Sequence, residues 1–334
     1  MEERILGRTG RGVGVVGLGA WQLGADWGEV SEADALATLT AAVDAGVTFI
    51  DTADVYGDGR SERIIGRLLR DHHDHDHNGT GGGLTVATKM GRRAPLDPAL
   101  YTLDNFRAWT DRSRTNLGVQ TLDLIQLHCP PPAVYATDAV YDALDTLVAE
   151  GRVAAYGVSV ETCAEALTAI ARPGVATVQI ILNAFRLKPL EQVLPAARAA
   201  GVGIIARVPL ASGLLSGAYD ETTRFGADDH RTFNRHGEAF DVGETFSGVD
   251  FDTGLTAVRR LAAHVPDGVT TAQFALRWII DQPGVSVVIP GARNAAQARA
   301  NAAAGDLPPL PAAAHAAVRA GYDELIRPRV HDRW

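Results

Sequence analysis

Four titratable side chains of different types stand at or just after β-rich runs of the sequence. Asp51 and Tyr56 lie in "FIDTADVYGDG", Lys89 ends "VATK", and His128 ends "LIQLH". A phenol has a pKa of about 10, too high for an efficient acid at neutral pH, but a nearby cation lowers it. We therefore expect Lys89 to lower the pKa of Tyr56, and Asp51 to anchor Lys89 by an ion pair. His128 would orient a substrate carbonyl or share the proton, so the set suits proton donation to a carbonyl oxygen.

Each of these residues also has an ordinary structural explanation. An aspartate at a strand end often caps a helix or accepts a hydrogen bond, a lysine there forms an ion pair, and a lone histidine is usually a satisfied polar group. A catalytic role is favoured over these structural explanations because all four residues are predicted to lie at the same end of the strands. In the same stretch we interpret Asp54 as the non-catalytic aspartate and expect Ser61 to cap the following helix.

The elements that must position these residues form a regular alternation of strands and helices. Such alternation is typical of parallel strands with crossover helices, and eight units favour an α/β fold of the closed (β/α)8 type. The carboxyl ends of the strands then meet at one face, where barrel enzymes carry their chemistry. The expected strands are 13–18, 48–50, 84–88, 122–127, 153–158, 177–182, 202–206 and 285–289, and the clearest helical patterns are 32–45, 101–117, 135–150 and 190–200.

Three regions depart from this alternation. The stretch "ERILGRTGRGV" before the first strand is expected to form a β-hairpin that plugs one end of the barrel. The tract "DHHDHDHNGTGGG" (71–83) has low complexity and falls at the opposite face from the chemistry, so a solvated insertion is favoured over a metal site. Residues 211–250 follow the seventh strand and are expected to cover a bound ligand. Two helical patterns, 254–264 and 270–281, precede the last strand.

Composition limits the remaining possibilities. The chain has 334 residues with no linker-like break, so we expect a single domain over 1–334. A net charge of -9 argues against a nucleic-acid partner. No run of about 18 apolar residues predicts a membrane span, and "MEERILGRTG" lacks a signal-peptide core, so a cytoplasmic protein is expected. Two cysteines, Cys129 and Cys163, do not make a disulfide framework. The oligomeric state is not indicated.

Several motifs together resemble the aldo-keto reductase superfamily. "GLGAWQLG", "FIDTADVYGDGRSERIIG", "ATKM", "LIQLHCP" and "VPLASGLLSG" stand in the family's order and spacing, and the likeness runs from "LGRTG" to at least Asn301. The resemblance implies a (β/α)8 TIM barrel with extra helices near the C-terminus, no metal, and a nicotinamide cofactor bound without a Rossmann fold. It assigns the family's catalytic set to Asp51, Tyr56, Lys89 and His128.

The resemblance also implies how the nicotinamide end of a cofactor would be held. Ser159 and Gln179 would contact the carboxamide, although Val160 stands where the family usually has asparagine. Ser159 could instead cap the next helix. Arg207 stands where many members have an aromatic residue. A guanidinium stacked on that ring would favour the neutral, reduced cofactor; alternatively Arg207 points toward the pyrophosphate.

The other end of the cofactor is expected at "IPGARNAAQARAN" (289–301), where a loop meets a helix N-terminus. Arg293 could pair with a 2′-phosphate, which favours NADP(H) and leaves NAD(H) possible. Gly213 and Leu215 would bring backbone close to the pyrophosphate. The other expected cofactor contacts are Trp21, Pro209, Leu210, Gly291, Gln297 and Asn301.

The sequence thus predicts an NADPH-dependent reductase of a small aldehyde or ketone, with Tyr56 as proton donor and Trp27 in the substrate pocket. Two alternatives on the same fold stay open. One is an NAD-dependent sugar or alcohol dehydrogenase, and the other is a non-enzymatic cofactor-sensing subunit of a membrane channel. A metal-dependent barrel hydrolase is disfavoured because His128 is the only histidine found at the predicted rim.

Overall fold

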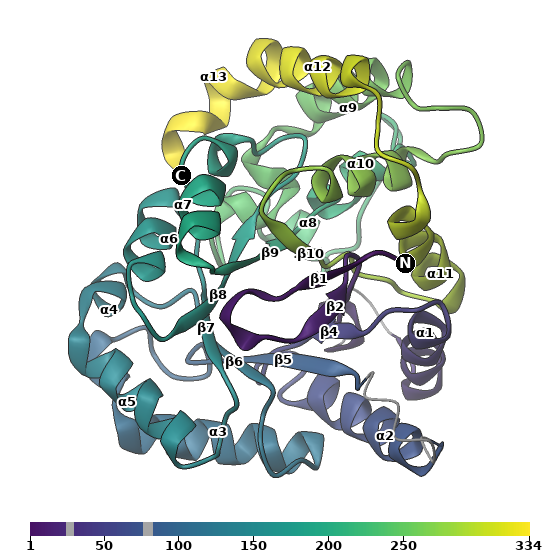
Figure 1. Ribbon diagram of the computed structural model, residues 1–334. Helices are drawn as coiled ribbons and strands as arrows, with labels where there is room; N and C mark the ends of the chain where they lie inside the picture. Colours follow the sequence, from purple (N-terminus) through teal and green to yellow (C-terminus); the bar gives the residue numbers. More distant parts are fainter. Residues whose placement is uncertain (25–29, 76–82) are drawn as a thin grey trace.

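A barrel of parallel strands surrounded by helices forms the body of the molecule (Figure 1). The computed structural model describes residues 1–24, 30–75 and 83–334, and only the backbone of 72–75. Within these residues, eight parallel strands pair in chain order from β3 to β10. Their bounds are Leu18–Gly19 (β3), Phe49–Asp51 (β4), Thr85–Met90 (β5), Leu124–His128 (β6), Tyr156–Ser159 (β7), Val175–Ile181 (β8), Gly203–Arg207 (β9) and Val285–Val288 (β10).

Isolated bridges close the sheet on itself. Val16 pairs with Val288 and Gly19 pairs with Gly291, both in parallel, so the first strand lies beside the last. Because this closure leaves no open sheet edge, the carboxyl ends of all the strands form one ring. The predicted α/β fold of the (β/α)8 type is confirmed.

An antiparallel hairpin fills one end of the ring. Strand β1 (Glu3–Ile5) pairs with β2 (Gly12–Gly14), and the hairpin lies across the middle of the barrel in Figure 1. Leu6 and Val13 are fully buried in a cluster with inward-facing residues of the barrel strands, among them Phe49, Ala87, Leu124, Ile205 and Val287. The prediction of a plugging hairpin is therefore confirmed.

The predicted first strand, 13–18, is wrong in its bounds. Val13 belongs to the hairpin, and the barrel strand β3 is only Leu18–Gly19. The error has a physical cause, since the hairpin plug and the barrel strand are both buried. The apolar run is therefore continuous across both elements and does not show where one ends.

Most helices on the outside of the barrel follow the predicted pattern. The predicted helix 135–150 is wrong at its start, because extended backbone at Thr137 (φ -89°, ψ 112°) separates a short helix ending at Ala136 from one beginning at Asp138. Ser31 caps α1 by accepting a hydrogen bond from the Asp34 amide, and Gly118, whose φ is 71°, forms the C-cap of α3. The helices are α1 Glu32–Asp44, α2 Arg60–His75, α3 Leu103–Leu117, α4 Pro132–Ala136, α5 Asp138–Ala149, α6 Cys163–Ile170, α7 Val193–Ala200, α8 His230–Phe233, α9 Phe251–Ala262, α10 Thr271–Ile280, α11 Ala295–Ala302, α12 Ala312–Gly321 and α13 Arg327–Val330.

Ser61 does not cap a helix, which corrects its predicted role. Helix α2 already begins at Arg60, and Ser61 is fully buried. Its hydroxyl donates to the Ala20 carbonyl and accepts from the Thr52 hydroxyl. Ser61 therefore ties α2 to the loops after β3 and β4, beside the face that carries the candidate chemistry.

The structure describes residues 211–250 in full and the histidine-rich tract only in part. Helix α2 runs into the histidine-rich tract as far as His75, and the rest of that tract, 76–82, lies outside the described residues, as does Trp27. Residues 211–250 contain short helical segments, η5 (Ala211–Ser216), α8, η6 (Val242–Glu244) and η7 (Phe246–Gly248). Among the described helices, none has the length and apolar character needed to cross a membrane.

Candidate active site

A cavity of about 490 Å³ opens at the carboxyl ends of the strands. Residues from the loop after β3, from several strand ends, from 211–250 and from α11 line its wall. Lys89 lies behind the wall, Leu215 is buried outside it, and Trp27 is not described. The sequence-predicted residues in the wall are Trp21, Asp51, Tyr56, His128, Ser159, Gln179, Arg207, Pro209, Leu210, Gly213, Gly291, Arg293, Gln297 and Asn301.

Lys89 joins the candidate acid to its support. Its side chain is 1% exposed, and its ammonium forms an ion pair with Asp51. The same ammonium donates to the Thr52 carbonyl at 2.9 Å and lies 3.4 Å from the Tyr56 hydroxyl. Asp51 ends β4 and Lys89 is the last residue but one of β5. Because these strands are neighbours in the sheet, residues 38 positions apart in sequence come into contact.

Two glutamines complete the surroundings of Asp51. Its second carboxylate oxygen accepts hydrogen bonds from the Gln126 amide at 3.0 Å and from the Gln179 amide at 2.7 Å. Gln126 was not singled out from the sequence, although a signal exists. It stands two residues before His128 in an otherwise apolar strand, and a period of two puts both side chains on one face. Gln179 reaches Asp51 as well as the cavity wall.

The pKa values of this group are set by burial and neighbouring charge. Burial raises the pKa of Tyr56, and the nearby charge of Lys89 lowers it by less, so the expected net lowering is wrong for this structure. Burial lowers the pKa of Lys89, but Asp51 and Tyr56 raise it by more, which keeps the ammonium charged. Burial, helped by Arg92 and Lys89, holds the pKa of His128 well below its usual range. Tyr56 is thus a protonated phenol and His128 a neutral imidazole at neutral pH.

Aromatic contacts connect Tyr56 to the long loop. The rings of Trp21 and Tyr56 lie nearly parallel with centroids 6.0 Å apart, and His128 meets the Tyr56 ring edge-on at 5.9 Å. Trp21 also packs against His230 and Phe240 of residues 211–250. The loop therefore contacts one side of the cavity, and it adds Ser212, Tyr219, Arg231 and Glu244 to the wall.

Arg207 is held in a buried ion-pair network. Its guanidinium lies 2.8 Å from Glu161 and 3.5 Å from Glu244, and it donates to the Val160 carbonyl at 3.0 Å. Arg92 contacts the same two carboxylates at 3.2 and 3.3 Å. The sequence did not indicate this network, because its members come from four separate segments. Stacking of Arg207 on a nicotinamide ring stays a prediction, and the carboxylates of Glu161 and Glu244 offset part of the positive charge assumed for that argument.

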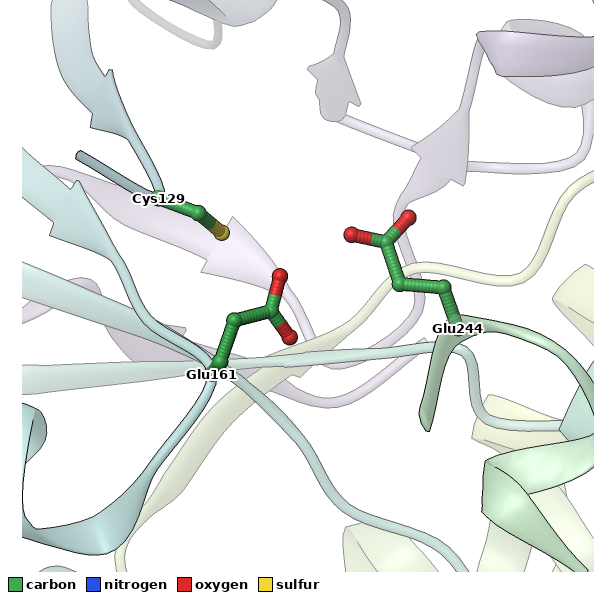
Figure 2. A group of neighbouring side chains, drawn as sticks. All are labelled: Cys129, Glu161 and Glu244. Atoms are coloured by element: carbon green, nitrogen blue, oxygen red, sulfur yellow. The ribbon is translucent and has the colours of Figure 1, made fainter. Parts of the chain in front are cut away.

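Glu161, Glu244 and the Cys129 thiol point toward one another (Figure 2). The atoms that they could offer to a metal ion lie within 4.8 Å of one another. Burial raises the pKa of Glu161, whereas Arg92 and Arg207 outweigh burial and lower the pKa of Glu244. Burial also raises the pKa of Cys129, so its sulfur stays a thiol. Two adjacent guanidinium groups repel a cation, and a thiol is a poor metal ligand. The group is therefore best described as an ion-pair network.

Ser159 does not cap α6, since Thr162 accepts the capping hydrogen bond from Glu165. Instead the Ser159 hydroxyl lies 3.2 Å from the Cys129 sulfur, at the cavity wall. The alternative that Ser159 serves only as a helix cap is thus excluded.

The far end of the cavity is built around the start of α11. Asn294 caps this helix, the Gln297 side chain accepts from the Arg293 amide at 2.9 Å, and Asn301 donates to the Gly291 carbonyl at 3.1 Å. Arg293 is exposed, and no hydrogen bond or ion pair joins its guanidinium to any residue that the structure describes. Gln297 and Asn301 therefore shape the loop, while Arg293 remains available to an anion.

Fold and site together define a class of protein: a barrel oxidoreductase with a lysine-supported tyrosine at the carboxyl ends of its strands. The chain belongs to the Aldo/keto reductase family, whose sequence model matches residues 15–323. Family membership makes it an oxidoreductase that acts on carbonyl or CH–OH groups.

Known relatives and solved structures are similar to this protein over most of its length. It is 30% identical over 305 residues to the aldo-keto reductase YhdN of Bacillus subtilis, covering 90% of this chain and 87% of that one. The glycerol dehydrogenase AKR11B4 from Gluconobacter oxydans is 28% identical, with a TM-score of 0.75 over 98% of this chain and 96% of that one. An aldo-keto reductase from Klebsiella pneumoniae in complex with NADPH is 23% identical, with a TM-score of 0.69 over 96% of both chains, and shows the fold alone.

Proposed function

We propose that this protein reduces an aldehyde or ketone to an alcohol with NADPH, and that Tyr56 donates the proton to the carbonyl oxygen. The observation that carries the proposal is the position of the Tyr56 hydroxyl, 3.4 Å from the buried Lys89 ammonium and at the cavity wall beside His128. Reversal of the same chemistry would oxidise an alcohol, as the name of the Gluconobacter oxydans glycerol dehydrogenase describes for that protein.

The cavity fits a nicotinamide dinucleotide. Its volume of about 490 Å³ lies within the range of small-molecule sites, roughly 300–1,000 Å³. It extends from Tyr56 and His128 to Arg293 and Asn301, and the buried His128 Nδ1 has no hydrogen-bond partner among the described residues. When bound, the cofactor supplies hydride to the carbonyl carbon or accepts it in the reverse direction.

The residues of this chain divide the remaining work. Tyr56 holds the proton because burial raises its pKa, and the Lys89 charge stabilises the phenolate left after transfer. Asp51 keeps the ammonium aimed at Tyr56. His128 is neutral, so a ring nitrogen can hydrogen-bond a carbonyl oxygen without adding charge. Trp21 helps to keep water from the acid by packing over the Tyr56 ring.

NADPH is preferred in this proposal because Arg293 stands exposed at the start of α11, beside the Tyr219 and Arg231 wall. A guanidinium matches a phosphate dianion in both charge and shape. The NADPH complex of the Klebsiella pneumoniae protein is consistent with this assignment for the fold.

A titration with NADPH, NADH, NADP and NAD, followed by tryptophan fluorescence, tests the proposal first. We expect NADPH to bind at least tenfold more tightly than NADH and to quench Trp21, which lines the cavity. Turnover with a panel of aldehydes and ketones is then measured from NADPH absorbance. A preference for NAD would favour the dehydrogenase alternative, and absence of nucleotide binding would contradict both.

A further inference from the structure

Glu244 is the one acidic residue that 211–250 contributes to the cavity wall. It ends the short segment η6, is 7% exposed, and contacts both Arg92 and Arg207. Glu244 therefore tethers a long loop to the ends of β5 and β9. The position of the Glu244 carboxylate therefore depends on the contacts that hold the neighbouring residues of the loop in place.

Trp334 contacts the same segment and is not part of the cavity wall. Its indole nitrogen donates to both oxygens of Asp241, at 3.0 and 3.3 Å. Asp241 in turn accepts a hydrogen bond from the Gly243 amide at 2.7 Å and so caps η6. One side chain distant in sequence thus fixes the residue that starts the turn ending at Glu244.

Arg186 stacks on the face of the indole. Its guanidinium carbon is 3.4 Å from the centroid of the Trp334 ring, the geometry of a close cation–π stack. Arg186 is 3% exposed, and its three guanidinium nitrogens have no hydrogen-bond partner among the described residues. A buried cation without a hydrogen-bond partner is costly, and the charges of Asp241 and Glu161, together with the π face of Trp334, offset part of that cost.

Two glycines show how closely this stack fits the loop. A Cβ atom on Gly243 would lie 2.3 Å from an Arg186 nitrogen and 3.0 Å from the Trp334 ring. Gly248 has a φ of +76°, and a Cβ there would lie 2.4 Å from the same ring. The loop backbone therefore rests directly on Trp334, with no side chain between them.

We propose that Trp334, which stacks on Arg186 and donates a hydrogen bond to Asp241, is a positioning residue that holds Glu244 in the cavity wall. Without it, residues 241–248 lose their support and Glu244 no longer restrains Arg207 and Arg92. The carbonyl site then loses a fixed wall beside Tyr56 and His128, while the Lys89–Asp51 pair on the barrel strands is untouched. The kinetic part of this inference rests on the proposed reductase activity.

The test is Trp334→Leu in the wild-type and Glu244→Gln backgrounds. We expect Trp334→Leu to raise KM for the carbonyl substrate about tenfold, with kcat changed less than about threefold, because ground-state fit is lost and the proton donor is not. In the Glu244→Gln background the same change should raise KM no further, since the two act through one contact. An unchanged KM, or an equal rise in both backgrounds, would overturn the proposal.

A milder variant and a control guard against a simple folding defect. Trp334→Phe keeps an aromatic face but lacks the nitrogen that donates to Asp241, and we expect a KM rise of about threefold. No rise would count against the proposal. Trp109→Leu, in α3, removes an indole that packs on Tyr101 and Phe106 and should leave KM unchanged.

Hydrogen exchange supplies a readout that does not depend on turnover. The amides of 243–249 should exchange faster in Trp334→Leu, while those of β5 and β9 keep their wild-type rates. Unchanged exchange in 243–249 would overturn the proposal even in a protein that reduces no carbonyl. Failure of the reductase assignment would instead show as absent wild-type turnover with this exchange pattern intact.

Discussion

Tyr56 keeps its proton because it is buried. In the proposed reaction, Lys89 would stabilise the phenolate that remains once the proton has been donated. The two effects oppose each other in the resting site, and burial prevails. This is a suitable starting state for an acid, because the phenol is protonated at neutral pH and the adjacent ammonium stabilises its conjugate base.

Removing the phenol hydroxyl should abolish proton donation without disturbing the fold. In Tyr56→Phe we expect kcat to fall by about 10²–10⁴, the usual contribution of a positioned acid, with cofactor affinity unchanged. Steady-state kinetics and nucleotide titration measure the two. Tyr101→Phe is a matched control, because the buried Tyr101 hydroxyl has no hydrogen-bond partner among the described residues. Wild-type turnover in Tyr56→Phe would remove Tyr56 from its role.

Arg293 and Arg299 allow a second paired comparison, since both are exposed and lie at α11. Arg293 lines the cavity, whereas Arg299 lies in a separate groove beside α1. Arg293→Ala should weaken NADPH about tenfold to a hundredfold and NADH much less, because a charged hydrogen-bond pair with the 2′-phosphate is lost. Arg299→Ala should change neither affinity. Calorimetric titration would decide, and equal losses for NADPH and NADH would refute the assignment.

At the scale of elements, the backbone of the hairpin before β3 packs directly against the backbone of the barrel strands. Gly7 follows β1 with a φ of +51°, and a Cβ there would lie 2.0 Å from the Gly203 nitrogen and 2.3 Å from the Ala176 carbonyl. These are backbone atoms of β9 and β8, so they could make room for a Cβ only if the strands themselves moved. The hairpin is therefore part of the core. Its apolar residues Leu6 and Val13 fill this end of the barrel.

A methyl group at Gly7 should therefore displace the hairpin from the barrel and destabilise the protein. We expect Gly7→Ala to lower the free energy of unfolding by about 3 kcal/mol, from overpacking combined with left-handed backbone strain. Gly10→Ala is the control, since Gly10 has a similar φ of +70° with nothing within 4 Å of its Cβ position, and it should cost only about 1 kcal/mol. Denaturant titration measures both, and equal losses would show that only the backbone conformation matters.

At the scale of the whole molecule, buried carboxyl groups make stability depend on pH. Asp54 is 1% exposed, its Oδ1 has no partner among the described residues, and burial together with Glu62 raises its pKa to about 7. A raised folded-state pKa means that the stabilising contribution is complete below the unfolded value of about 4. It is lost as pH rises to about 7.

Asp54→Asn should remove this dependence. The variant should gain stability relative to the wild type as pH rises from about 4 to about 7, and the gain should level off above that. Its size should be about 4 kcal/mol, because the pKa is raised by about three units and one pKa unit corresponds to about 1.4 kcal/mol. Urea titrations of both proteins across this range measure the difference. A difference independent of pH would show that the Asp54 pKa is unshifted.

The sequence by itself determined the alternation of strands and helices, the plugging hairpin and the family. Period-two strands, amphipathic helices and strand-end positions are local properties that can be read without any contact. The same locality placed Asp51, Lys89 and His128 on one rim, because parallel strands share the direction of their carboxyl ends.

Only the tertiary structure decided where buried elements divide and what polar side chains touch. Val13 and Leu18 belong to different elements although both are buried, and Ser61 ties loops together instead of capping a helix. Arg92 meets Glu244 across 152 residues of sequence, and Trp334 reaches Asp241 across 93. Such contacts depend on how distant segments pack, and no local pattern encodes them.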